Sequence, residues 1–355
     1  MNNVIVVEAY FQNENTEQKL NETIALIKAD GANYVGTVKQ CVKEITPSTY
    51  IGKGKLSEIK NAVQEKNADI VLFDGELSPS QTNNISDEVG VVVITRTNLI
   101  LDIFAKRAKS SEGKILVELA QLEYLYPRLV GKGDSLSRLG GGIGTRGPGE
   151  TKLETDRRHV KSRILSLKNK LREIEKRRDE QSKRRTKNNL KTVALVGYTN
   201  TGKSTLLNRI CSGNVFSENM LFATLDPTLK TRNLYGKNVI FTDTVGFIKD
   251  LPPQLLRAFR STLDVAKSAD LIVNVSAYDD DYLLQHDITD GVLNDMKATD
   301  NRINVINKKD LKNDTSDNML HAIEISATTG EGLDRLLITV YENLFGEKPN
   351  IEYSA

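Results

Sequence analysis

The first hundred residues alternate short apolar runs with segments in which apolar positions recur every three or four residues. The apolar runs lie at residues 4–7, 69–74 and 91–94, and the segment from Leu56 to Val63 has helical spacing. Short, continuous apolar runs are typical of strands buried on both faces, and helices between such strands are typical of a parallel sheet. We therefore expect an N-terminal parallel α/β domain over residues 1–108.

Two longer segments follow, each with a single apolar stripe. Their apolar residues recur at spacings of three and four, at Ile115, Leu119, Leu122 and Tyr126 in the first segment and at Val160, Ile164, Leu167, Leu171 and Ile174 in the second. Each pattern predicts a helix with one face to bury. The simplest way to bury both faces is a long antiparallel helical hairpin over residues 109–190, in which Pro127 ends or kinks the first arm.

The strand and helix pattern returns after the hairpin. Residues 192–197 predict a strand that leads into a turn containing glycine, and further strands are predicted at 239–241 and 323–325. Residues 191–355 are therefore a second predicted α/β domain. Its polar motifs all lie where a predicted strand ends.

The composition is that of an ordinary globular protein, with 39% hydrophobic and 27% charged residues in a chain of 355. No apolar run approaches the roughly 20 residues that span a bilayer, and the start of the chain lacks the pattern of a secretion signal. The two cysteines, Cys41 and Cys211, lack the spacing of a disulfide framework or a zinc site. We expect a cytoplasmic monomer with no membrane span.

The charge is unevenly distributed along the chain. The segment from Lys152 to Lys191 holds 16 Lys or Arg side chains and 6 Asp or Glu side chains, which gives it a net charge of +10. The whole chain carries +2, so the remainder carries −8. Such a concentration of positive charge indicates a polyanionic partner for the second arm of the hairpin.

A glycine-rich segment separates the two arms. Residues 138–150 contain six glycines, two arginines and a proline. One interpretation is a passive flexible linker. We favour a loop that orders against phosphate and ribose, because the arginines lie at the tip of a strongly basic hairpin. The candidate RNA-binding residues of the loop and of the arm that follows it are Arg138, Gly141, Gly142, Arg146, Arg157 and Arg158.

Residues 197–204 read Gly-Tyr-Thr-Asn-Thr-Gly-Lys-Ser, which is the spacing of a phosphate-binding loop. Gly197 and Gly202 let the backbone wrap closely around phosphate, so that its N–H groups point at the nucleotide oxygens. Lys203 would place a cation on the β and γ phosphates, and the Ser204 hydroxyl would bind Mg²⁺. The next helix adds its N-terminal dipole to the same site.

Two further motifs are expected to sense the γ phosphate. Asp243 follows a predicted strand and is placed to reach magnesium through a water, while Gly246 offers an N–H to the γ phosphate. Thr224 is the candidate for a switch threonine that closes on magnesium and the γ phosphate, and Thr228 is its rival. Phe247 stands where many signalling GTPases carry the glutamine that orients water, so intrinsic hydrolysis is expected to be slow until a partner orders the switches.

Residues 307–310, Asn-Lys-Lys-Asp, decide the base. The Asp310 carboxylate can accept from both N1–H and the N2 amino group of guanine, a donor pair that adenine lacks. The pair Ser326 and Ala327, which follows a predicted strand, would bring a backbone N–H to the guanine O6. The candidate nucleotide-binding residues are Gly197, Tyr198, Thr199, Asn200, Thr201, Gly202, Lys203, Ser204, Thr205, Asp243, Gly246, Asn307, Lys308, Asp310, Ser326 and Ala327. The candidate catalytic residues are Lys203, Thr224, Gly246 and Asn200, and the candidate metal ligands are Ser204 and Thr224.

These motifs, together with residues 50–55, 101–105, 118–122 and 138–158, resemble the HflX family of ribosome-associated GTPases. The resemblance implies a C-terminal P-loop GTPase domain over residues 191–355 that hydrolyses GTP to GDP with Mg²⁺. It also implies binding to the large ribosomal subunit and its RNA, and dissociation of stalled or idle ribosomes under stress. Potassium is a further candidate cofactor, because Asn200 stands where an asparagine helps hold this ion in several GTPases.

Two alternative functions remain open from the sequence. The chain could be an assembly factor that binds immature large subunits without splitting ribosomes. It could also remodel RNA through ATPase activity in its N-terminal domain, where the segment from Gly52 to Lys55 is a weak nucleotide-site candidate.

Overall fold

The computed structural model describes residues 1–11, 16–129, 148–187, 190–211, 228–249, 266–278, 281–312 and 320–350. By its internal contacts the chain divides into two compact units. The first unit comprises residues 1–106 and 115–169, and the second comprises residues 107–114 and 170–355.

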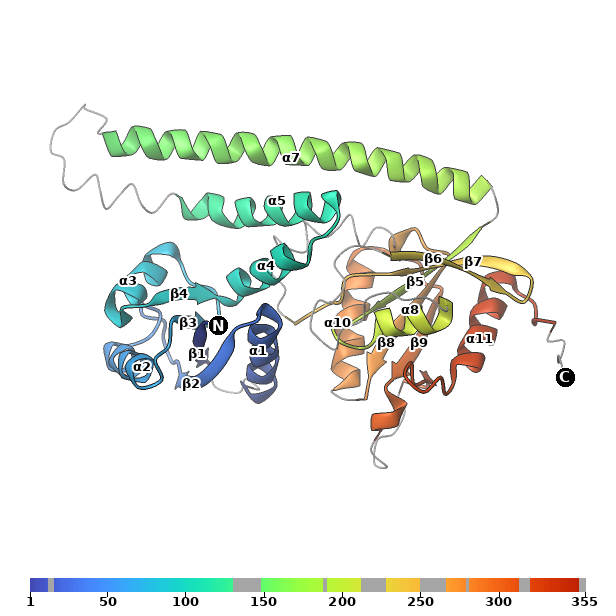
Figure 1. The fold of residues 1–355 in the computed structure, drawn as a ribbon, viewed down its shortest axis with the longest axis horizontal. Helices are drawn as coiled ribbons and strands as arrows, with labels where there is room; N and C mark the ends of the chain where they lie inside the picture. Colours follow the sequence, from blue (N-terminus) through green and yellow to red (C-terminus); the bar gives the residue numbers. More distant parts are fainter. Residues whose placement is uncertain are drawn as a thin grey trace. The chain divides into compact units, whose positions relative to one another are not determined.

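The first unit contains a four-stranded, fully parallel sheet in the order β2-β1-β3-β4 (Figure 1). Its strands are β1 (Asn3–Tyr10), β2 (Asn33–Cys41), β3 (Ile70–Phe73) and β4 (Val92–Thr95). The helices between the strands are α1 (Thr16–Asp30), α2 (Lys53–Glu65) and α3 (Pro79–Val89). The predicted parallel α/β architecture is confirmed.

The side chains of each strand point alternately to the two faces of this sheet, and those of β1 are buried on both. Ile5 and Val7 of β1 lie on one face, where they form a cluster with Ile59 of α2 and Ile85 of α3. Val4 and Val6, which alternate with these residues along β1, are also buried, so both faces of the strand are covered. A continuous apolar run is therefore the correct signature of β1.

Within the described residues, helices follow β4 up to residue 187 without a further strand. They are α4 (Arg96–Arg107), α5 (Ser111–Arg128) and α7 (Pro148–Lys187). Helix α7 is continuous over 40 residues, which at 1.5 Å per residue corresponds to about 60 Å. Pro127 lies in the last turn of α5, where it ends the helix as expected.

Helices α5 and α7 form the predicted antiparallel pair. The Arg163 guanidinium on α7 donates to both carboxylate oxygens of Glu118 on α5, at 2.6 and 2.9 Å. The Arg157 guanidinium lies over the Tyr126 ring, 5.5 Å from its centroid. The residue number on α7 falls from 163 to 157 as that on α5 rises from 118 to 126, so the two helices run in opposite directions. Leu167, in the predicted apolar stripe of α7, is fully buried.

Helix α5 buries a second face that the sequence pattern did not reveal. Leu116, Ala120 and Tyr124 are all buried, although they lie outside the predicted stripe. The Tyr124 hydroxyl is 2.8 Å from the hydroxyl of Thr95, the last residue of β4. Helix α5 therefore packs on two sides and is tied to the end of the sheet.

The second unit contains a six-stranded sheet in the order β10-β9-β8-β5-β7-β6. All neighbouring strands pair in parallel except β6 with β7. The strands are β5 (Lys191–Gly197), β6 (Thr228–Leu234), β7 (Lys237–Asp243), β8 (Leu271–Ala277), β9 (Arg302–Asn307) and β10 (Ile323–Glu324). The helices that the structure describes in this unit are α8 (Lys203–Cys211), α10 (Tyr282–Asp295), the 3₁₀ turn η1 (Lys309–Leu311) and α11 (Leu333–Phe345).

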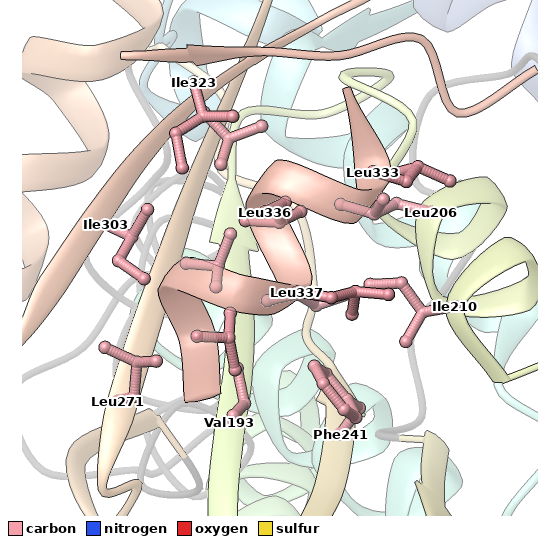
Figure 2. Packing of buried hydrophobic residues seen from close by; sticks show 14 of the residues in the cluster. Val193, Leu206, Ile210, Phe241, Leu271, Ile303, Ile323, Leu333, Leu336 and Leu337 are labelled. Atoms are coloured by element: carbon pink, nitrogen blue, oxygen red, sulfur yellow. The ribbon is translucent and has the colours of Figure 1, made fainter. Parts of the chain in front are cut away.

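Helices α8 and α11 cover one face of this sheet. Leu206 and Ile210 of α8 and Leu336 of α11 pack together with Phe241 of β7 and Val193 of β5 (Figure 2). Burying each large apolar side chain of this kind stabilises the fold by about 1.5–3 kcal/mol. This core holds the carboxyl ends of the strands at fixed positions. Among the described helices, none combines the length and the apolarity that crossing a bilayer requires.

Candidate nucleotide site

The loop that joins β5 to α8 lies at the carboxyl edge of the second sheet. Strand β5 ends at Gly197 and α8 begins at Lys203, so five residues connect them. Because β5 pairs in parallel with both β7 and β8, the segments that follow those strands lie at the same edge. Ligands of open α/β sheets bind at this edge.

Close backbone contacts explain the two glycines of the loop. A Cβ atom on Gly197, whose φ is +156°, would lie 2.1 Å from the Val275 carbonyl oxygen. A Cβ atom on Gly202, whose φ is +85°, would lie 2.4 Å from Nδ2 of Asn307. Only glycine fits these positions, because any side chain would overlap an atom of a neighbouring strand end.

Lys203 is buried, and its ammonium group is held by the loop itself. Its Nζ donates to the carbonyl oxygens of Gly197 at 3.1 Å and of Tyr198 at 2.6 Å. Burial lowers the pKa of Lys203 to about 8, against the opposing effect of the Asp243 carboxylate. At neutral pH the loop therefore presents a largely protonated amine whose direction is fixed, which suits the binding of phosphate.

Ser204 and Asp243 bring two oxygen ligands together. The Ser204 hydroxyl donates to Oδ2 of Asp243 at 2.6 Å, and Asp243, the last residue of β7, is fully buried. Hydroxyl and carboxylate oxygens are the ligands that Mg²⁺ prefers, so this pair fits the ion. Within the described ranges, no group of three or more His, Cys, Asp or Glu side chains could hold a metal.

The segment after Asp243 is hydrogen-bonded to the phosphate loop. The Phe247 N–H donates to the Gly197 carbonyl at 3.1 Å, and the Thr199 N–H donates to the Phe247 carbonyl at 2.7 Å. A Cβ atom on Gly246 would lie 2.7 Å from Cα of Thr199 and 3.0 Å from Nζ of Lys203. Gly246 is thus beside the lysine, while the Phe247 ring is buried.

Asn307 connects the base-recognition motif to the phosphate loop. It is the last residue of β9 and is 2% exposed. Its Nδ2 donates to the Thr201 carbonyl at 2.8 Å, and its Oδ1 accepts from the Ala327 N–H at 2.9 Å. One side chain therefore brings together three of the motifs that the sequence predicted to share a site.

Asp310 presents a carboxylate at the edge of this cluster. Its side chain is exposed, and a hydrogen bond from Ser326 lowers the pKa of Asp310, with Thr328 and Lys308 acting in the same direction. The carboxylate is therefore ionised at neutral pH. An ionised carboxylate at this position is a strong acceptor for paired N–H donors.

Several predicted residues cannot be placed. Thr224 lies outside the described residues, as do Arg138, Gly141, Gly142 and Arg146. Thr228, the rival of Thr224, is the first residue of β6 and pairs in register with Asp243. Arg157 and Arg158 both lie on α7, with Arg158 exposed.

Sequence reasoning missed a polar cluster beside the base motif. The Tyr278 hydroxyl donates to Oε1 of Glu324 at 2.7 Å, and Lys312 Nζ donates to the same oxygen at 2.8 Å. The three residues brace the loop after Asn307 from two neighbouring strands. No spacing rule joins positions 278, 312 and 324, so the sequence held no signal that could have found them.

The glycines near residue 52 differ from those of the phosphate loop. Gly52 is the N-cap of α2, so Lys53 and Lys55 lie in the first turn of that helix. A Cβ atom on Gly52 or Gly54 would meet no atom within 4 Å. Lys55 forms an ion pair with Glu58 at 2.6 Å. These glycines are not required by a close approach of the backbone, in contrast to Gly197 and Gly202.

Comparisons with known proteins match successive parts of the chain to three family descriptions. They are "GTP-binding GTPase N-terminal" over residues 17–105, "GTP-binding GTPase Middle Region" over 107–185 and "50S ribosome-binding GTPase" over 192–329.

Relatives match over nearly the whole chain. A protein named GTPase HflX from Caldanaerobacter subterraneus is 48% identical over 353 residues, which are 98% of this chain and 82% of the relative. GTPase HflX from Escherichia coli strain K12 is 40% identical over 97% of this chain and 83% of the relative. A crystal structure of SsGBP in complex with GDP shares the fold, with a TM-score of 0.53 and 23% identity over 96% of this chain and 98% of that one.

Proposed function

Because the chain belongs to the HflX family and is a GTPase, we propose that it binds the large ribosomal subunit and dissociates stalled or idle ribosomes under stress. The match of residues 192–329 to 50S ribosome-binding GTPases carries this proposal. In this scheme GTP holds the conformation that binds the subunit, and hydrolysis releases it.

The site residues take the roles for which their positions suit them. Lys203 contacts the β and γ phosphates, the Gly246 N–H contacts the γ phosphate, and Asp310 recognises guanine. Thr224 remains the proposed switch threonine. The other proposed members of the nucleotide site are Gly197, Tyr198, Thr199, Asn200, Thr201, Gly202, Thr205, Asn307, Lys308, Ser326 and Ala327.

Ser204 would hold Mg²⁺ directly, and Asp243 would act on it through a water. The ion neutralises charge on the phosphates when it is bound. Potassium is proposed as a second ion near Asn200, whose backbone has a φ of +63°. Replacing potassium with sodium in a hydrolysis assay tests this role, and identical rates in the two salts would contradict it.

The basic arm supports an RNA partner. Exposed side chains along α7 include Arg158, Lys161, Arg172 and Lys176. Phosphate contacts of this kind make binding steeply dependent on salt. We propose that this arm, with Arg157 and the glycine-rich loop, contacts ribosomal RNA, and that the chain acts in the cytoplasm as three domains at 1–108, 109–190 and 191–355.

A sucrose-gradient experiment tests the function. GTP or a non-hydrolysable analogue, but not GDP, is expected to make the protein convert paired ribosomes into free subunits. Co-sedimentation with precursor particles only would instead support an assembly factor. Paired ribosomes that persist with every nucleotide, and no association with either particle, would refute both.

Charge reversal tests the proposed RNA contact. The double variant Lys161→Glu, Arg172→Glu is expected to weaken subunit binding and to lower the salt dependence by about one phosphate contact per residue. Lys60→Glu on α2 is the control, because that lysine is also exposed but lies outside the basic arm. Equal effects from both variants would contradict a specific contact through α7.

A further inference from the structure

Tyr198 joins the phosphate loop to the segment that carries Gly246. Its hydroxyl accepts a hydrogen bond from the Lys249 N–H at 2.7 Å, across 51 positions of sequence. The tyrosine is 8% exposed, so most of its ring is packed in the domain. Tyr198 therefore contacts the segment around Gly246 through its side chain, in addition to its place in the backbone of the phosphate loop.

This hydrogen bond replaces a backbone–backbone hydrogen bond of a parallel β-ladder. Tyr198 and Phe247 form an isolated parallel bridge, made by the Phe247 N–H to Gly197 and the Thr199 N–H to Phe247. In a regular ladder the next bond would join the Lys249 N–H to the Thr199 carbonyl. The loop turns at Asn200, where φ is +63°, and the Tyr198 hydroxyl accepts the bond instead.

The bridged segment holds Gly246 next to Lys203. A Cβ atom on Gly246 would lie 3.0 Å from the lysine Nζ. The side chains of Phe247 and Ile248 are both 3% exposed, so their packing anchors the segment. The Lys249 side chain is exposed, and its N–H is the part of the residue that the bond to Tyr198 uses.

We propose that the Tyr198 hydroxyl is a latch that holds residues 246–249 on the phosphate loop and thereby sets the preference of the site for GTP over GDP. The inference rests on the nucleotide site proposed above. Only a nucleotide with a γ phosphate can accept a hydrogen bond from the Gly246 N–H. If residues 246–249 are held less firmly, a smaller fraction of the protein has this N–H in place, so binding of GTP weakens while binding of GDP is unchanged. Tyr198 acts through Gly246 and is a positioning residue.

The test compares two ligands on the full chain carrying Tyr198→Phe. Affinity for a non-hydrolysable GTP analogue is expected to fall about threefold to tenfold, the effect of losing one net hydrogen bond. Affinity for GDP is expected to stay within about twofold. Equal weakening for both ligands would mean that Tyr198 only maintains the loop, and no change for either would mean that the bond is dispensable; both results would overturn the proposal.

Two controls keep the result interpretable. Tyr341→Phe removes the hydroxyl of another buried tyrosine of the same unit, which donates to Glu347 at 3.2 Å, and should leave the ratio of the two affinities unchanged. Thermal unfolding of both variants verifies that they fold. If neither nucleotide binds even the parent chain, the proposed site itself fails, which is distinct from failure of the latch.

Discussion

Protonation of Lys203 should be coupled to nucleotide binding. Burial lowers the pKa of this lysine from 10.5 to about 8, which corresponds to about 3 kcal/mol of lost preference for the charged form. Phosphate beside the amine would favour the charged form and raise the pKa again. Binding of GDP near pH 8 should therefore take up a proton.

The size of the uptake follows from the fraction of neutral amine in the free protein. About half a proton per GDP is expected at pH 8 and about a tenth at pH 7. Affinity for GDP should accordingly weaken as pH rises above 8. In the nucleotide-free protein the sign is opposite, because between about 8 and 10.5 the unfolded chain holds a proton that the folded chain has lost, so stability rises with pH there.

Calorimetry in two buffers of different ionisation enthalpy measures the uptake. GDP binding to the parent chain at pH 8 should show a buffer-dependent heat that nearly vanishes at pH 7. Lys203→Met should abolish the dependence, at protein concentrations raised to compensate for weaker binding. Lys309→Met, which removes a lysine at the same edge that pairs with Glu331, should retain it. Absence of uptake in the parent at pH 8, or its persistence in Lys203→Met, would refute the reasoning.

Three further substitutions test other parts of the molecule. Gly197→Ala should lower the free energy of unfolding by more than about 1 kcal/mol in urea and abolish GDP binding, because its Cβ would overlap the Val275 carbonyl; parental stability would contradict this. Asp310→Asn should weaken GDP about tenfold or more by removing a charge-assisted acceptor, and an unchanged Kd by fluorescence titration would count against the role of this residue. Tyr124→Phe should lower stability by about 1 kcal/mol through loss of the bond to Thr95, with GDP affinity unaltered as measured by calorimetry; a weaker GDP complex would show that the effect is not local.

The spacing of apolar residues predicted those strands and helices whose buried face follows from neighbouring positions in the sequence. The apolar run of β1 and the stripe of α7 that includes Leu167 correspond to buried positions, because strand and helix periods determine which side chains share a face. The same reasoning found one face of α5 and missed the other. Leu116 and Tyr124 pack in a different direction from the stripe. Both faces of the helix follow the same helical period, so the period alone does not show that the helix buries two faces.

The motifs predicted which segments lie together at the carboxyl edge of the second sheet, and the contacts among these segments came from the structure. Gly197 and Lys203 follow a spacing set by the geometry of phosphate binding, so they can be read from the chain. The bond between Tyr198 and Lys249 joins residues distant in sequence, one through a side chain and the other through its backbone. No pattern of residue types encodes such a pair, because any residue except proline can supply the N–H.

The double hydrogen bond of Asn307 has a thermodynamic consequence. Its amide joins the Thr201 carbonyl to the Ala327 N–H, so a displacement on one side strains the other. We therefore expect recognition of the purine ring and binding of the diphosphate to be cooperative, so that their separate contributions to affinity do not add. Guanosine, which lacks phosphates, should still favour the conformation of the phosphate loop that binds phosphate. Inorganic pyrophosphate should in turn favour the conformation of residues 307–310 that binds the purine ring.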